Sequence, residues 1–152
     1  MSRILVIESS ARQQGSVSRE LTQQFIANWQ AAHPADQIQV RDLAAEPVPH
    51  LDATLLGGWM TPSEQRSDAE KAALARSNQL TDELLAADVL VLAAPMYNFA
   101  IPSTLKAWLD HVLRAGVTFK YTETGPQGLL TGKRAFVLTA RGGISVSYTH
   151  LR

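Results

Sequence analysis

Cysteine is absent from the 152-residue chain, and this absence removes a whole group of functions. Thiol nucleophiles, disulfide frameworks and metal or iron–sulfur centres held by cysteine all need that side chain. A chain without cysteine also suits a reducing compartment. We therefore expect a cytoplasmic protein whose chemistry does not depend on sulfur.

Net charge and long hydrophobic runs are missing as well. The 14 basic and 14 acidic residues balance to +0, which favours neither a nucleic-acid surface nor a strongly acidic docking face. No apolar run approaches the roughly 18 residues of a membrane span. The first run, residues 4–7, ends at Glu8 and is too short for the core of a signal peptide. We expect neither nucleic acid nor a membrane among the partners.

Histidines are few and scattered, at positions 33, 50, 111 and 150. No pair has the spacing of metal ligands, so we expect no metal. His111 belongs to a predicted helix, and we expect it at the surface or the helix terminus rather than in catalysis. No acid–base pair or nucleophile stands out, so no catalytic side chain is predicted.

Strands are predicted wherever short apolar runs end at loop residues. Residues 4–7 are a continuous aliphatic run, which is typical of a strand covered on both faces, and residues 89–94 and 135–139 are two further apolar runs. Ile38 and Val40 alternate with polar residues, as in a strand near the edge of a sheet. These strands alternate with helical patterns, which predicts a three-layer, doubly wound parallel α/β sheet.

Helices are predicted between these strands. The first has apolar residues three or four positions apart, which predicts one buried stripe at Leu21, Phe25, Trp29 and Ala32. The second opens on a capping box of Ser67 and Glu70, and the third begins after Pro102 and ends at Gly116. Residues 44–60 are predicted to be loop with one short helix, and residues 117–132 a turn-rich excursion.

Three loops of unusual composition follow separate strands. Ligands of open parallel sheets bind beyond the carboxyl ends of the strands, and residues 9–18, 95–99 and 140–143 occupy that position. The first loop carries four serines directly before a helix, which suits a phosphate. It lacks the glycine patterns of dinucleotide and Walker sites, so a monophosphate is favoured. The alternative is that Ser16 or Ser18 only caps the helix.

The other two loops suit a flat ring. Met96, Tyr97, Asn98 and Phe99 place large side chains on an exposed turn, where a heteroaromatic ligand could pack. Core packing of Tyr97 and Phe99 is the alternative. Gly142 and Gly143 would let the backbone approach a ligand closely, although an ordinary turn is the better explanation of this loop taken alone. The coincidence of three such loops at one sheet edge favours a ligand site.

Several motifs resemble the FMN-dependent NADH-azoreductases, a group within the flavodoxin-like NAD(P)H quinone oxidoreductases. The most specific are Met-Tyr-Asn-Phe at residues 96–99 and Arg-Ala-Gly-Val-Thr-Phe at residues 114–119. The others are Ser9-Ser10, Ser16-Val17-Ser18, Arg41-Asp42-Leu43, Gly128-Leu129, and Thr139 with Arg141-Gly142-Gly143. The resemblance implies a flavodoxin-like fold with strand order 2-1-3-4.

The same resemblance implies the site. Ser10, Ser16, Val17 and Ser18 would hold the phosphate and ribityl chain of FMN. Met96, Tyr97, Asn98 and Phe99 would line its ring, and Ala140, Arg141, Gly142 and Gly143 would contact the polar edge of the ring. Ala140 stands where well-known members carry serine, which removes one side-chain hydrogen bond. Phe119 and Tyr121 would lie near the substrate and serve across the interface of a homodimer.

The implied function is two-electron hydride transfer from NADH or NADPH to quinones and azo compounds, with ping-pong kinetics. A non-catalytic flavodoxin-type electron carrier is an alternative, but it would be strongly acidic. An inactive fragment of a reductase is another. The family pattern runs to about residue 144, and we expect its last strand and helix to be missing. We therefore expect a domain over residues 1–144 and an atypical tail over residues 145–152.

Overall fold

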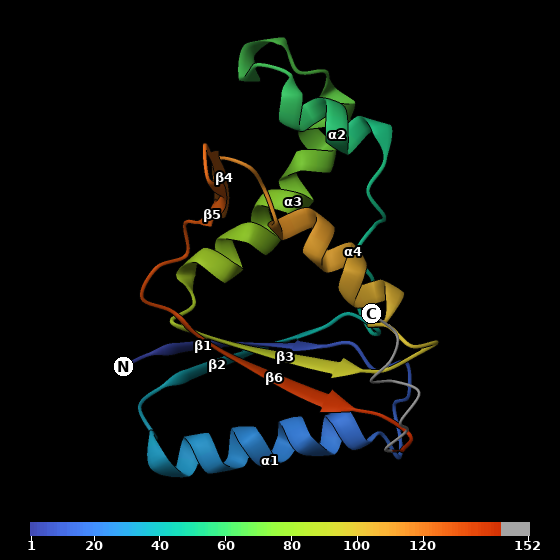
Figure 1. Ribbon diagram of the computed structural model, residues 1–152, viewed down its shortest axis with the longest axis vertical. Helices are drawn as coiled ribbons and strands as arrows, with labels where there is room; N and C mark the ends of the chain where they lie inside the picture. The colour runs from blue at the N-terminus through green and yellow to red at the C-terminus, as the bar shows by residue number, and fades with distance from the viewer. Residues whose placement is uncertain (144–152) are drawn as a thin grey trace.

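The computed structural model describes residues 1–143, so Ile144 and the predicted tail over residues 145–152 lie outside the described residues. Four parallel strands form the main sheet in the order β2-β1-β3-β6 (Figure 1). Their bounds are β1 (Arg3–Glu8), β2 (Gln37–Asp42), β3 (Val89–Pro95) and β6 (Arg134–Ala140). The predicted 2-1-3-4 order is confirmed, with β6 as the fourth strand.

Helices cover both faces of the sheet and complete the predicted three layers. Helix α1 lies on one face, and α3 and α4 lie on the other (Figure 1). The helices are α1 (Val17–Ala32), α2 (Ala53–Met60), α3 (Asp68–Ala86) and α4 (Ser103–Val112), with a 3₁₀ turn η1 (Ser63–Gln65). A hairpin of β4 (Phe119–Thr122) and β5 (Gly125–Gly128) projects beside α3.

Strand β1 explains why the interior has two halves. Side chains alternate across a strand, so Leu5 and Ile7 enter the core beneath α3 and α4, whereas Ile4 and Val6 face α1. The first half also contains Trp108, which is almost fully buried. A continuous apolar run is thus required for a strand covered on both faces.

Helix α1 differs from its predicted stripe. Phe25 and Trp29 pack on the sheet as expected, with ring centroids 5.6 Å apart. Leu21 and Ala32 are exposed, so their assignment to the stripe was wrong. At the amino end of the helix the buried positions are Ser18 and Thr22, and the Thr22 hydroxyl donates to the Ser18 carbonyl. Small hydroxyl side chains therefore replace aliphatic packing where α1 meets the loops.

The capping box of α3 is confirmed, since Ser67 Oγ accepts from the Glu70 amide and the Glu70 carboxylate accepts from the Ser67 amide. Helix α4 ends at Val112, so the predicted end at Gly116 was wrong. Gly116 has φ +80 and lies in the turn before the hairpin, a conformation that glycine adopts without strain. The predicted excursion over residues 117–132 contains that hairpin, which the polar sequence did not indicate.

His111 is a further correction. It lies in the last turn of α4, which agrees with the expected position at the helix terminus, but it is buried rather than at the surface. Its Nε2–H donates to the Pro49 carbonyl oxygen 2.8 Å away, because a carbonyl can only accept. His111 thus connects α4 to the chain that precedes α2. No helix in residues 1–143 combines the length and the apolar character that crossing a membrane requires.

Candidate functional site

The three predicted loops meet at the carboxyl ends of β1, β3 and β6. They enclose an open cleft of about 310 Å³. Nine of the residues predicted to contact a cofactor line it: Ser10, Ser16, Val17, Ser18, Met96, Tyr97, Ala140, Arg141 and Gly142. Arg12, Gly15 and Pro95, which the sequence did not single out, complete the lining. Segments that are far apart in the sequence thus form one concave site.

The first loop presents a cluster of buried hydroxyls. The Ser16 hydroxyl donates to Ser10 Oγ over 2.8 Å and lies 3.2 Å from Ser18 Oγ. Ser16 also caps α1, because its Oγ accepts from the Arg19 amide at 3.4 Å. Capping and ligand binding are therefore compatible at Ser16. The amino end of a 16-residue helix and three hydroxyls make a donor set that suits a phosphate.

Tyr97 joins the second loop to the first. Its phenol oxygen shares a hydrogen bond with Ser10 Oγ at 3.2 Å and accepts from the Ala11 amide at 3.1 Å. The ring of Tyr97 is only partly buried, and Phe99 is 69% exposed, so core packing does not explain Phe99. The aromatic loop belongs to the cleft and its rim.

A tight turn shapes the second loop. Asn98 and Phe99 have φ of +49 and +66, and the flanking Tyr97 and Ala100 exchange two backbone hydrogen bonds of 3.0 and 3.1 Å. Two positive φ angles in a four-residue turn are the pattern of a type I′ turn. An aromatic residue in this region is strained, and such strain gathers at functional sites. Met96, Asn98 and Phe99 border a smaller hollow of about 220 Å³ beside the cleft.

The third loop is tied to the second and leaves open space. The Met96 amide donates to the Ala140 carbonyl over 2.8 Å. A Cβ built on Gly142 or Gly143 would meet no atom of residues 1–143 within 4 Å, chain neighbours apart. Neither glycine is required by the packing of residues 1–143, so both leave room for a ligand. Gly143 follows Gly142 just outside the cleft lining.

Arg19 is the residue that sequence reasoning missed. Its guanidinium bonds both carboxylate oxygens of Asp42, at 2.7 and 3.0 Å, and the backbone carbonyls of Ser10 and Arg12. This contact lowers the pKa of Asp42, while burial raises the pKa of Glu8 at the end of β1. The only available signal was that Arg19 directly follows Ser16-Val17-Ser18.

The charges of the cleft favour an anion. Its lining holds two arginines, Arg12 and Arg141, and no carboxylate. The nearby Asp42 is already paired with Arg19. No group of three or more histidine, aspartate or glutamate side chains in residues 1–143 is arranged to hold a metal ion. The cleft is thus suited to a ligand with a phosphate and an apolar body.

Phe119 and Tyr121 do not reach this cleft within one chain. They lie on β4 with ring centroids 5.4 Å apart, and Tyr121 is 76% exposed. Phe119 instead borders a hollow of about 330 Å³ with Trp59 and Met60. Figure 1 shows the hairpin away from the arrowheads that mark the carboxyl ends of the strands.

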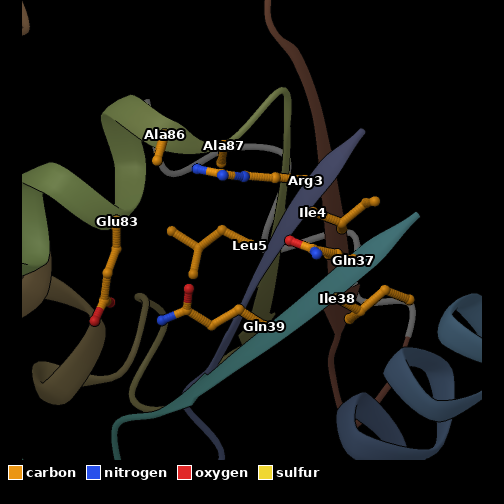
Figure 2. A pocket seen from close by; sticks show the side chains of 9 residues that line it. All are labelled: Arg3, Ile4, Leu5, Gln37, Ile38, Gln39, Glu83, Ala86 and Ala87. Carbon is orange, nitrogen blue, oxygen red and sulfur yellow. The ribbon is translucent and has the colours of Figure 1, made fainter. Parts of the chain in front are cut away.

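A separate pocket of about 280 Å³ lies near the opposite end of the sheet. Figure 2 shows Arg3, Gln39 and Glu83 around it, between β1, β2 and the end of α3. Its Glu83 is engaged by Arg41, whose Nε donates over 3.2 Å. None of the predicted site residues lines this pocket.

Comparisons with known proteins agree with the fold. A family model described as a flavodoxin-like fold matches residues 2–151. FMN-dependent NADH:quinone oxidoreductase 2 of Pseudomonas fluorescens is 83% identical over 144 residues, which are 95% of this chain and 72% of that protein. The Pseudomonas putida protein of the same name is 84% identical with the same coverage.

Solved structures of azoreductases share this fold. An azoreductase from Bacillus anthracis matches with a TM-score of 0.88 and 33% identity, over 95% of this chain and 71% of that chain. A Bacillus anthracis FMN-dependent NADH-azoreductase in complex with FMN matches with a TM-score of 0.88 and 31% identity, over 98% and 74%.

Proposed function

Because the chain belongs to the flavodoxin-like family that contains the FMN-dependent NADH:quinone oxidoreductases, we propose that it binds FMN and uses NADH to reduce quinones and azo compounds. The single observation that carries this proposal is the cleft that unites the three loops. NADPH is the alternative donor. The fit of the cleft to FMN rests on its serine hydroxyls, its two arginines and its aromatic rim.

Three groups of residues would contact three parts of FMN. Ser10, Ser16, Val17 and Ser18 would hold the phosphate and the ribityl chain at the amino end of α1. Met96, Tyr97, Asn98 and Phe99 would line the ring. Ala140, Arg141, Gly142 and Gly143 would contact its polar edge by backbone amides, since Ala140 has no side-chain donor.

FMN supplies two-electron chemistry, so the protein needs to provide position and hydrogen bonds rather than an acid, a base or a nucleophile. The cleft residues fit this requirement, because they offer hydrogen bonds and an aromatic surface. The loops are tied together by Tyr97 and by the Met96 amide, which reduces the ordering that a ligand must impose. Phe99 at the rim of the cleft is 69% exposed, so a second flat molecule could reach its ring.

We also propose that two chains form a homodimer in which Phe119 and Tyr121 serve the partner's cleft. In support, both lie on a projecting hairpin and neither contributes to the cleft of its own chain. Exposed Leu56, Met60 and Leu113 surround the same region, and apolar exposure of this kind marks interfaces. Sedimentation equilibrium tests the assembly, and a monomer at working concentrations would contradict it. A cytoplasmic site of action suits a chain that forms no disulfide.

Steady-state kinetics of the FMN-loaded chain test the function. Varying NADH and a quinone should give parallel double-reciprocal lines, because the two substrates react in turn. Gly142→Val is the matched cleft variant. A Cβ at this position meets no atom of residues 1–143 within 4 Å, its chain neighbours apart, so we expect the variant to fold while its branched side chain occupies the cleft and excludes FMN.

The two alternatives give different results. A chain that keeps FMN but oxidises no NADH in the presence of quinone would be a carrier. A folded chain that retains no FMN would be an inactive fragment.

A further inference from the structure

We infer that Arg19 is a positioning residue that orients the backbone of the first loop for the phosphate group. The inference rests on the proposed function, because it concerns the same cleft. Arg19 does not line the cleft, and its guanidinium contacts the Ser10 and Arg12 carbonyls and Asp42 instead. It would therefore act on the ligand through the loop.

Four hydrogen bonds fix the guanidinium in place. Nε donates to the Arg12 carbonyl at 2.8 Å, and Nη2 donates to the Ser10 carbonyl at 2.9 Å. Nη1 and Nη2 also bond the two oxygens of Asp42, at the end of β2, at 2.7 and 3.0 Å. The side chains of Arg19 and Asp42 are 14% and 25% exposed, so the group is largely withdrawn from water. Arg19 therefore connects two alternate carbonyls of the loop to a neighbouring strand.

Holding these carbonyls also orients the amides of the loop. In a trans peptide the C=O and the following N–H point in opposite directions. With the Ser10 carbonyl turned toward Arg19, the Ala11 amide points the other way and donates to the Tyr97 hydroxyl at the cleft. The same rule turns the Gln13 amide away from Arg19. Carbonyl oxygens would repel a phosphate, whereas amide hydrogens attract it.

These contacts explain why an arginine can occupy this position. It is the third residue of α1, and a cation near the amino end of a helix is disfavoured by the helix dipole. Asp42 offsets that cost, and this contact lowers the pKa of the Asp42 carboxyl. The pair brings no net charge to the phosphate site, so its contribution lies in geometry.

The test compares FMN with riboflavin, which lacks the phosphate. Binding is measured by quenching of flavin fluorescence for the wild type, Arg19→Met and the control Arg76→Met. Arg76 lies on α3 and donates to Gln79 of the same helix, so the control makes the same chemical change away from the cleft. We expect Arg19→Met to weaken FMN binding about tenfold, or about 1.4 kcal/mol, with riboflavin binding unchanged.

A double variant separates geometry from charge. Arg19→Met/Asp42→Asn restores the charge balance but leaves the loop carbonyls free, so FMN binding should stay weak. Recovery of wild-type affinity would show that charge alone matters and would overturn the inference.

Equal weakening of FMN and riboflavin, or no weakening by Arg19→Met, would also overturn it while the proposed function stands. A wild type that binds neither flavin would overturn both.

Discussion

Replacing Tyr97 with phenylalanine removes one oxygen atom and isolates the bridge between the first two loops. That oxygen makes two hydrogen bonds, of 3.2 Å with Ser10 Oγ and 3.1 Å with the Ala11 amide. A hydrogen bond contributes about 0.5 to 1.5 kcal/mol, and the Ala11 amide lies at an exposed position where water can replace the tyrosine. We therefore expect the free energy of unfolding to fall by about 1 kcal/mol. The ring itself stays, so the aromatic wall of the cleft is preserved.

The same loss should appear in the affinity for FMN. Without the bridge, the two loops must be ordered by the ligand, and about 1 kcal/mol corresponds to about a fivefold rise in Kd. Urea denaturation and flavin fluorescence measure the two quantities. Tyr121→Phe is the matched control for stability, because Tyr121 loses the same atom from an exposed hairpin position. Unchanged stability and affinity for Tyr97→Phe, or equal losses of stability in both variants, would refute the reasoning.

Three further predictions concern stability, each measured by urea denaturation. Glu83→Ala should lower the free energy of unfolding by about 3 kcal/mol, because the side chains of Glu83 and its partner Arg41 are only 12% and 9% exposed. Glu46→Ala removes a 67% exposed partner of the same arginine and should lower it by less than about 1 kcal/mol. Equal losses in the two variants would contradict this. Burial raises the pKa of Glu8 above its ordinary 4.5, so the folded state keeps a proton that the unfolded state releases, and stability should fall as pH rises above 4.5. Glu8→Gln should remove this fall, and an unaltered pH profile would argue against it. Phe99→Gly should be about 1 kcal/mol more stable than Phe99→Ala, because both remove the ring but only glycine relieves the positive φ; a more stable alanine variant would rule out the strain.

The predictable part of the fold came from short-range patterns. Apolar runs such as residues 89–94 are typical of buried strands, and the Ser67 capping box marks the start of α3 within four residues of sequence. The strand order required the family resemblance, since alternation alone fixes no neighbours. The three loops were predictable because parallel strands end at one edge of a sheet.

The missed features depend on contacts between distant segments. Arg19 binds Asp42 because β1 and β2 pair in parallel, which no local pattern indicates. Leu21 is exposed because Ser18 and Thr22 take the sheet-facing positions at the start of α1. His111 is buried because the chain around Pro49 lies against α4. Each error arose because local propensity does not report the tertiary contacts that a residue makes.

The reducing half of the reaction tests the central claim most directly. The purified chain is loaded with FMN, freed of excess flavin, and mixed with NADH without oxygen or quinone. We predict that the flavin absorbance is bleached with about one NADH consumed per FMN, and that it returns when a quinone is added. Retained flavin that NADH fails to bleach would contradict the account.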